Sequence, residues 1–198
     1  MRIPIIVLAA GLSSRFGRNK LFETFGSSTL IEHIVFEALK SKAQRAIVVG
    51  GHDFQRLCRT LEKFDCEIVF NEEFAKGQSY SVRRGVLAVD ESADALMILP
   101  GDVVLMNHEI INRVVDAFAK THAPIVSAGY RGRPGHPILF GKELFSELKE
   151  IDEETRGLKR VVSNHVSQAV IVETSQASLF DLDTQEDMQR LDKIRSEV

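Results

Sequence analysis

Residues 3–20 read IPIIVLAAGLSSRFGRNK, a short apolar run followed by a polar loop of small residues. The run from Ile3 to Ala10 does not alternate between polar and apolar positions, which is typical of a strand buried on both faces of a sheet. The loop from Gly11 to Gly17 would then leave the carboxyl end of this strand, where open α/β sheets bind their ligands. This order predicts an α/β fold with a binding site at that edge.

The first 120 residues continue this alternation of short apolar runs and helical patterns. Strands are predicted at 3–10, 45–50, 67–70 and 95–100. A capping box from Thr29 to Glu32 predicts the start of the first helix. Further helix starts are predicted at Asp53, at Ser79 or Ser81, and at Asn107. The pattern predicts a mostly parallel sheet with helices on both faces.

After Pro124 the pattern changes. Strands are predicted at 125–130, 137–140 and 169–173, and helices at 142–150 and 156–165. Asp183-Thr184 would open a final amphipathic helix. Because neither an internal repeat nor a linker-like stretch interrupts the chain, we expect one domain over residues 1–198, with a mixed sheet that includes an antiparallel second half.

Composition excludes several classes of protein. Hydrophobic residues make up 44% and charged residues 27%, as in ordinary globular proteins. The net charge of −3 argues against nucleic acid as a partner. No apolar run approaches the roughly 20 residues of a membrane-spanning helix, and we see no signal peptide. Cys58 and Cys66 lack metal-ligand spacing and are expected to be reduced. We therefore expect a cytoplasmic protein without a membrane partner.

The loop from Leu8 to Lys20 has the composition of a phosphate cradle. Its small residues allow close approach of the backbone to a ligand, and Arg15 and Lys20 add positive charge that favours phosphate. The loop is neither a Walker A sequence nor a dinucleotide-binding fingerprint, because the glycine spacing of both is absent. The alternative is a basic surface turn.

Two acidic positions are candidate metal ligands. Asp102 follows Gly101 at the end of the predicted strand 95–100, and a carboxylate beside phosphates is a typical Mg²⁺ ligand. Asp183, in the acidic run from Asp181 to Asp187, is the candidate second carboxylate. Asp102 would also fit a chain turn, and Thr184 with Asp187 resembles a capping box, so part of the run is structural.

Two further segments have functional and structural interpretations. Gly77, Ser79 and Ser81 lie at a predicted helix start, where the hydroxyls would contact a base or ribose, or cap the helix. His136 lies between Gly135 and Pro137 in a predicted loop that enters a strand. It would contact a second substrate, or only shape the turn.

Together these segments resemble the MobA/MocA family of nucleotidyltransferases, and more narrowly its molybdenum cofactor cytidylyltransferase (MocA-type) branch. The family's LAAGxSxRxGxxK opening is matched by Leu8 to Lys20, and its DxDTxED run by Asp181 to Asp187. Gly101-Asp102 and the Gly-His-Pro at 135–137 match in family order. Val103-Val104 departs from the polar-proline pair that often follows the metal aspartate. The resemblance implies a GT-A-like, Rossmann-related, three-layer α/β/α sandwich with a mixed, mostly parallel sheet.

The resemblance also implies a reaction, in which an NMP moves from an NTP, with CTP favoured, to a phosphorylated acceptor, and pyrophosphate leaves. The acceptor implied is molybdopterin or the molybdenum cofactor. Arg15, Lys20 and Asp102 would be catalytic, and Asp102 and Asp183 would bind Mg²⁺. The nucleotide would contact Leu8, Ala9, Ala10, Gly11, Ser13, Arg15, Lys20, Gly77, Ser81, Gly101 and Asp102. The acceptor would contact Gly135, His136 and Pro137, so that residues 1–120 form a nucleotide-binding half and residues 121–198 an acceptor-facing half.

Alternative functions stay open at this point. A transferase of the same fold would use GTP, or act on a sugar phosphate or an alcohol phosphate. A protein of another class would bind nucleotides without catalysis, although the presence of Lys20, Asp102 and Asp183 together favours an enzyme. For the cofactor-synthesising function, the product would pass to a molybdoenzyme or its chaperone.

Overall fold

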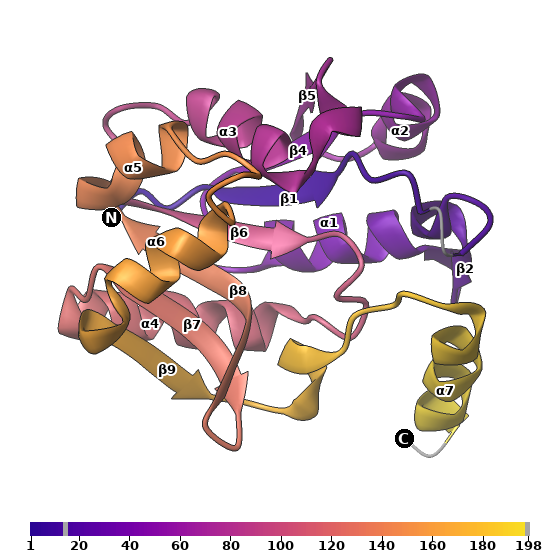
Figure 1. The fold of residues 1–198 in the computed structure, drawn as a ribbon. Helices are drawn as coiled ribbons and strands as arrows, with labels where there is room; N and C mark the ends of the chain where they lie inside the picture. Colours follow the sequence, from indigo (N-terminus) through magenta and orange to yellow (C-terminus); the bar gives the residue numbers. More distant parts are fainter. Residues whose placement is uncertain (14–15, 197–198) are drawn as a thin grey trace.

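A computed structural model describes residues 1–13 and 16–196 of the chain (Figure 1). Its centre is a mixed β-sheet with helices on both faces, which confirms the predicted fold class. The strands of this sheet in the described residues are β1 (Ile5–Ala9), β4 (Ala46–Gly50), β5 (Glu67–Phe70), β6 (Ala95–Pro100), β7 (Ile125–Tyr130), β8 (Arg133–Gly141) and β9 (Ala169–Glu173).

The strand order is β5-β4-β1-β6-β8-β7-β9. The first four strands in this order are parallel, β8 is antiparallel to both of its neighbours, and β9 is parallel to β7. The carboxyl ends of β1, β4 and β6 therefore lie at one edge of the sheet. Because β8 runs the other way, its first residues lie at this same edge.

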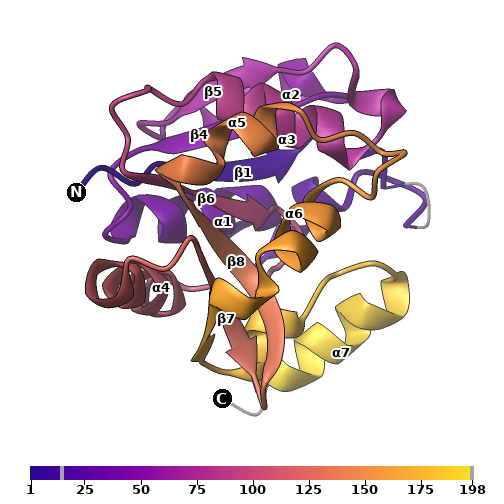
Figure 2. The ribbon, with the colours of Figure 1, turned by 60° about the vertical axis from the view of Figure 1, so that its left-hand side comes forward.

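Helices form a layer on each face of the sheet (Figures 1 and 2). One core contains buried residues of α1 (Leu30–Lys40), α2 (Phe54–Leu61) and α4 (His108–Thr121). The opposite core contains those of α3 (Gln78–Leu87), α5 (Phe145–Lys149) and α6 (Leu158–Asn164). The remaining elements are η1 (Lys20–Phe22), β2 (Thr24–Phe25), β3 (Ser28–Thr29), η2 (Phe74–Lys76), η3 (Lys142–Leu144), η4 (Val166–Gln168), η5 (Gln176–Leu179) and α7 (Gln185–Ser196).

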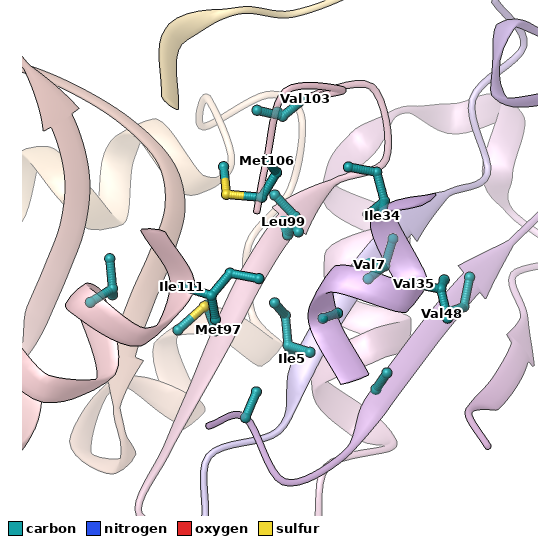
Figure 3. Close-up of a cluster of buried hydrophobic side chains, with 14 of the residues drawn as sticks. Ile5, Val7, Ile34, Val35, Val48, Met97, Leu99, Val103, Met106 and Ile111 are labelled. Atoms are coloured by element: carbon teal, nitrogen blue, oxygen red, sulfur yellow. The ribbon is translucent and has the colours of Figure 1, made fainter. Parts of the chain in front are cut away.

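Successive residues of β1 enter opposite cores. Ile5 and Val7 pack with α1, as Figure 3 shows, whereas Ile6 packs with α3 on the other face. All three side chains are completely buried, and burial of such a side chain stabilises a fold by about 1.5–3 kcal/mol. Within the described residues, no helix has the length and apolar character needed to cross a membrane.

Two predicted helix starts have different outcomes. The capping box of α1 is confirmed: the Thr29 hydroxyl accepts a hydrogen bond from the Glu32 amide at 3.4 Å, and the Glu32 carboxylate accepts from the Thr29 amide at 2.7 Å. Asp53 precedes α2 but makes no capping hydrogen bond to it. Its carboxylate accepts instead from the side-chain amide of Asn19 at 2.9 Å, a contact 34 residues away in sequence.

The predicted start of α3 at Ser79 or Ser81 is wrong. The helix begins at Gln78, directly after Gly77, and both serines are buried within its first turns. Gly77 has a φ of 130°, a conformation that side chains strongly disfavour. The glycine, rather than a serine cap, thus allows the chain to turn into the helix.

The prediction of a loop from Arg133 to His136 is also wrong, because β8 begins at Arg133. Pro134 pairs with Gly129 of β7 after a register shift between Ser127 and Gly129. On the β6 side, pairing is confined to the later residues, from Ile138 to Gly141. Pro134 therefore lies where β8 is paired on one side, and proline is tolerated at such edges.

Gly85 provides a test of the packing between α3 and the sheet. A Cβ atom at this position would lie 2.4 Å from Cγ2 of Ile6. Alanine normally stabilises a helix relative to glycine by up to about 1 kcal/mol. We predict the opposite for Gly85→Ala, a loss of about 1–3 kcal/mol caused by overpacking. Urea denaturation would measure it.

Gly11→Ala is the matched control, because a Cβ there would have no neighbour within 4 Å. A Gly85→Ala protein at least as stable as the wild type would contradict the close packing of α3 on β1.

Candidate functional site

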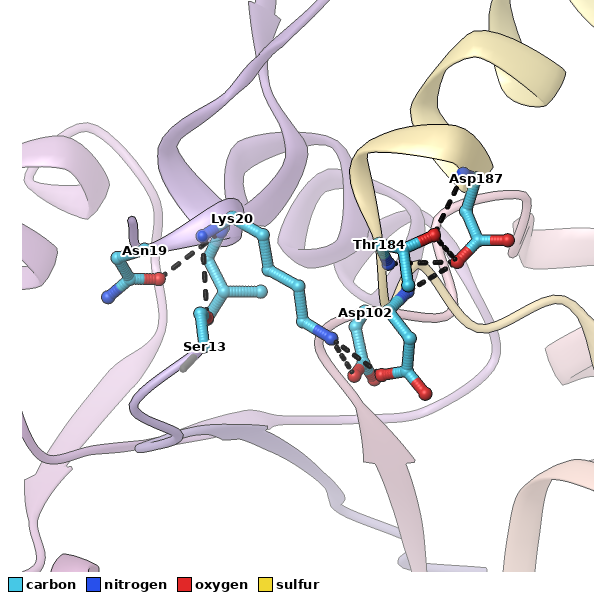
Figure 4. Close-up of polar contacts among 8 residues, drawn as sticks. Ser13, Asn19, Lys20, Asp102, Thr184 and Asp187 are labelled. Carbon is cyan, nitrogen blue, oxygen red and sulfur yellow. Dashed lines mark hydrogen bonds and ion pairs between the residues drawn. The ribbon is translucent and has the colours of Figure 1, made fainter. Parts of the chain in front are cut away.

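Lys20 lies at the centre of a cluster of charges at the carboxyl edge of the sheet. The loop after β1 delivers it to the start of η1, where the Asn19 side chain accepts a hydrogen bond from the Leu21 amide at 3.2 Å. The Lys20 side chain is 11% exposed. Its Nζ donates to Oδ2 of Asp102 at 2.7 Å and to Oδ1 of Asp183 at 3.2 Å (Figure 4). The structure thus brings together three residues selected from the sequence.

Asp102 is positioned by the way in which β6 ends against β1. The Gly101 amide donates to the carbonyl of Leu8 at 2.9 Å, and a Cβ on Gly101 would lie 2.9 Å from that same oxygen. Glycine is therefore needed for this close approach. Val103 and Val104 are both completely buried and anchor the segment that follows Asp102.

Asp183 is held by the residues that start α7. The Leu182 amide donates to the carbonyl of Asp102 at 2.9 Å. The Asp187 carboxylate accepts from the amides of Thr184 at 2.8 Å and Asp183 at 3.1 Å, and the Asp187 amide donates to the Thr184 hydroxyl at 3.2 Å. These contacts confirm the capping box and fix the backbone of Asp183 beside that of Asp102.

Asp181 is a further acidic member of this cluster that the sequence analysis did not select. Burial, together with the negative charges of Asp102 and Asp183, raises the pKa of its carboxyl to about 6, against the opposing effect of Lys20. The sequence does contain a signal for Asp181: it lies two residues before Asp183, and residues two apart in an extended segment point to the same side. Two acidic side chains thus bond to the ammonium group of Lys20, and a third, Asp181, lies within its electrostatic influence.

A cavity of about 510 Å³ opens beside Lys20 and Asp102. Eight residues predicted to bind nucleotide line it: Leu8, Ala10, Gly11, Ser13, Lys20, Gly77, Ser81 and Asp102. Ala9 and Gly101 do not line it, and Arg15 lies outside the described residues. The analysis of the sequence missed six lining residues: Leu12, Leu21, Phe74, Ala75, Gln78 and Pro100. A cavity of this size with mixed polar and apolar walls is typical of a small-molecule site.

Ser81 has a structural contact as well as a place in the cavity wall. Its hydroxyl accepts a hydrogen bond at 3.0 Å from the buried side-chain amide of Asn71, which follows β5. Oδ1 of Asn71 accepts in turn from the Glu73 amide at 3.0 Å. The hydroxyl that was predicted to meet a ligand therefore also joins α3 to the end of β5.

His136 lies in β8, beside the carboxyl edge of β6, and outside the cavity wall. Its Nδ1 is buried and has no hydrogen-bond partner in the described part of the chain. Burial lowers the pKa of the imidazole, while the charge of Asp102 acts in the opposite direction. The adjacent Gly135 packs against η5, where a Cβ would lie 2.2 Å from the Ser178 carbonyl oxygen. His136 is thus a mostly buried, neutral side chain near Asp102.

The acidic cluster has part of the chemistry of a divalent metal site. Across residues 1–13 and 16–196, no three His, Cys, Asp or Glu side chains are arranged to hold a metal ion. However, the carboxylates of Asp102 and Asp183 both bond to the ammonium group of Lys20, and Asp181 lies close enough for their negative charges to add to the effect of burial in raising the pKa of its carboxyl. Mg²⁺ usually takes one or two protein carboxylates and completes its shell with phosphate oxygens and water. The residues present fit this pattern.

Curated relatives match most of this chain but only part of their own length. The bifunctional protein GlmU of Cereibacter sphaeroides is 26% identical over 165 residues, which cover 79% of this chain and 36% of that protein. The chain spans about a third of the length of the curated GlmU relatives that it matches.

Solved structures share the fold over nearly the whole chain. Rv0371c from Mycobacterium tuberculosis has a TM-score of 0.86 at 21% identity, covering 96% of this chain and 97% of that one. It has also been solved as a manganese complex, with a TM-score of 0.81, 20% identity and coverage of 96% and 98%. A nucleotidyl transferase from Methanothermobacter has a TM-score of 0.82 at 23% identity, covering 98% and 99%.

Residues 5–170 match the family described as the MobA-like NTP transferase domain. This range contains β1, the loop with Lys20, the turn at Gly77, and Asp102. Asp181 and Asp183 lie beyond it, although their side chains complete the same charged cluster. The resemblance on which the sequence analysis relied is confirmed at the level of the family: the chain belongs to the MobA-like NTP transferase domain family.

Proposed function

We propose that the chain transfers a nucleoside monophosphate from an NTP to a phosphorylated acceptor and releases pyrophosphate. The observation that carries this proposal is the pairing of Lys20 with Asp102 and Asp183 at the mouth of the cavity between the β1 loop and α3. A cation and paired carboxylates at the carboxyl edge of such a sheet are the groups that a triphosphate requires. The family match supports the same chemistry.

In this reaction, an oxygen of the acceptor phosphate attacks the α-phosphorus of the NTP. A new P–O bond forms, the bond to the β-phosphate breaks, and pyrophosphate leaves with the electron pair. The acceptor is already ionised, so no protein group has to remove a proton from it. The main requirement is to place two anions in line and to stabilise the charge that develops between them.

Different residues would contact the phosphates and hold the metal ion. Lys20 would donate to phosphate oxygens as charge develops, since its ammonium group is buried and held in place before the substrate binds. Asp102 and Asp183 would hold Mg²⁺, which when bound supplies a Lewis acid for the phosphate oxygens. Arg15 is proposed to add a second positive charge on the same loop. The nucleotide would occupy the cavity of residues 1–120.

The choice of particular substrates rests on the resemblance of two sequence motifs to the MocA-type pattern. CTP and molybdopterin are proposed because Leu8 to Lys20 and Asp181 to Asp187 match the MocA-type pattern. Transfer of the product to a molybdoenzyme or its chaperone, in the cytoplasm, belongs to the same proposal. GTP with the same acceptor, or a sugar or alcohol phosphate as acceptor, would use the same charged cluster. A nucleotide-binding module without catalysis is the alternative of a different class.

One experiment separates these possibilities. Each of the four NTPs is incubated with Mg²⁺ and with molybdopterin, a sugar phosphate or an alcohol phosphate, and pyrophosphate release is followed. We expect release with CTP and molybdopterin. Pyrophosphate release with another NTP and acceptor would support a transferase with different substrates. NTP binding without pyrophosphate release under any condition would favour the non-catalytic module.

Replacement of the two carboxylates tests the proposed metal site. We predict that Asp102→Asn and Asp183→Asn each abolish Mg²⁺-dependent pyrophosphate release, because an amide is a poorer ligand for a hard cation. Asp65→Asn, an exposed position between α2 and β5, is the control and should keep wild-type activity. If an Asn variant showed the same Mg²⁺-dependent pyrophosphate release as the wild type, the replaced carboxylate would not be a metal ligand.

Replacement of the lysine tests the charge balance. Lys20→Ala should lower kcat by about 10²–10³, the usual cost of removing one preorganised charge contact. Without its ammonium group, the acidic side chains at 102, 181 and 183 repel one another. Mg²⁺ should therefore raise the melting temperature of this variant more than that of the wild type. Lys120→Ala, at an exposed position near the end of α4, serves as control. Wild-type turnover would contradict the role of Lys20.

Replacement of His136 tests the proposed acceptor wall. Because His136 lies near Asp102 but outside the cavity wall, we predict that His136→Ala raises the acceptor KM or lowers kcat. The affinity for CTP, measured by isothermal titration, should stay nearly unchanged. A large loss of CTP affinity with an intact response to the acceptor would reverse this assignment.

A further inference from the structure

The turn from Asp152 to Gly157, which joins α5 to α6, packs on the start of α3. The Glu153 carboxylate accepts a hydrogen bond from the Ser79 amide at 2.6 Å. The turn is closed by its own contacts: Oδ1 of Asp152 accepts from the Thr155 amide at 2.6 Å, and the Gly157 amide donates to the Asp152 carbonyl at 2.8 Å. Glu153 therefore reaches α3 from a locally ordered turn.

Two glycines let these segments approach each other closely. Gly77 has a φ of 130°, and a Cβ on it would lie 2.4 Å from the carboxyl carbon of Glu153. Gly157 has a φ of 50°, and a Cβ on it would lie 2.4 Å from the Ser79 hydroxyl. A side chain at either position would be strained by the positive φ and would displace the side chain of Glu153 or Ser79 from its place in the contact.

This contact lies directly behind the wall of the nucleotide cavity. Gly77 and Gln78 line that cavity. Gln78, Ser79 and Glu153 line a neighbouring cavity of about 520 Å³, so the residue Gln78 lines both cavities. A change in the position of Glu153 would therefore change the wall that faces the proposed nucleotide.

The hydrogen bond that Glu153 accepts also pairs a backbone N–H group that has no partner within α3. The amide of Ser79 lies in the first turn of α3, where backbone N–H groups have no partner within the helix. A carboxylate is favoured there because it meets the positive end of the helix dipole and forms a charge-assisted hydrogen bond. Gly77 itself offers no side chain to cap the helix.

We propose that Glu153 is a positioning residue for nucleotide binding, which holds the turn from Gly77 to Ser79 in the shape that the NTP requires. This inference rests on the proposed function, because it assigns the cavity to an NTP. Glu153 belongs to the second half of the chain, so the nucleotide pocket would depend on a residue from outside residues 1–120. Without the carboxylate, the NTP would have to order the turn as it binds, which weakens its affinity.

The test compares Glu153→Ala, Glu153→Gln and the control Glu154→Ala. Glu154 is an exposed neighbour whose side chain has no hydrogen bond or ion pair in the part of the chain that the structure describes. Isothermal titration with each of the four NTPs in the presence of Mg²⁺ gives the Kd, pyrophosphate release gives KM and kcat, and thermal melting reports folding.

We expect Glu153→Ala to raise the Kd and KM of the NTP about three- to tenfold, which lies in the range for the loss of one typical hydrogen bond, because Glu153 is exposed to water. The kcat at saturating NTP should change little, because Glu153 does not reach the reacting atoms. Glu153→Gln keeps an acceptor oxygen and should restore part of the affinity. Glu154→Ala should behave as the wild type in all three measurements.

The possible failures are distinguishable. If the wild type binds NTP and Glu153→Ala binds it equally well, the inference is overturned while the proposed function stands. If Glu153→Ala lowers kcat with an unchanged KM, a positioning role in nucleotide binding is overturned as well. If the wild type binds none of the four NTPs, the proposed function fails, and this inference with it.

Discussion

The ammonium group of Lys20 bonds to carboxylates that lie 82 and 163 residues away along the chain. One buried charge thus ties the loop after β1 to the end of β6 and to the segment before α7. The opposing acidic side chains outnumber it, since Asp181 lies close enough for Asp102 and Asp183 to raise the pKa of its carboxyl. Such an arrangement leaves an excess of negative charge, which a divalent cation would balance.

The topology of the sheet brings these charged groups to one edge. β1 and β6 are parallel neighbours, so the loops after them leave the same edge. Gly101 lets the end of β6 approach the backbone of Leu8, which brings Asp102 beside the first loop. The antiparallel direction of β8 brings His136 to this edge from the other half of the chain. A parallel β8 would place its first residues at the opposite edge, far from Asp102.

Local signals in the sequence predicted the features that depend on local physics. The unbroken apolar runs identified the buried strands, and the reciprocal hydrogen bonds of Thr29 and Glu32 needed only their spacing of three residues. Lys20, Asp102 and Asp183 were found because each follows or precedes a recognisable element. The start of β8 was missed because prolines and a glycine at 134–137 resemble a turn, and the strand begins there only through the pairing of Arg133 and Pro134 with β7. Glu153 was missed because its partner, Ser79, lies 74 residues away.

His136 shows how burial and charge decide the chemistry available to a side chain. A buried imidazole without a hydrogen bond on Nδ1 costs about 1–3 kcal/mol relative to a paired one. Loss of water lowers the pKa of this imidazole, so at neutral pH the ring carries no charge, despite the opposing charge of Asp102. A neutral ring contributes a hydrogen bond but no attraction for a phosphate. In the proposed function, Lys20 and a bound cation would therefore neutralise the reacting anions, and His136 would add no charge of its own.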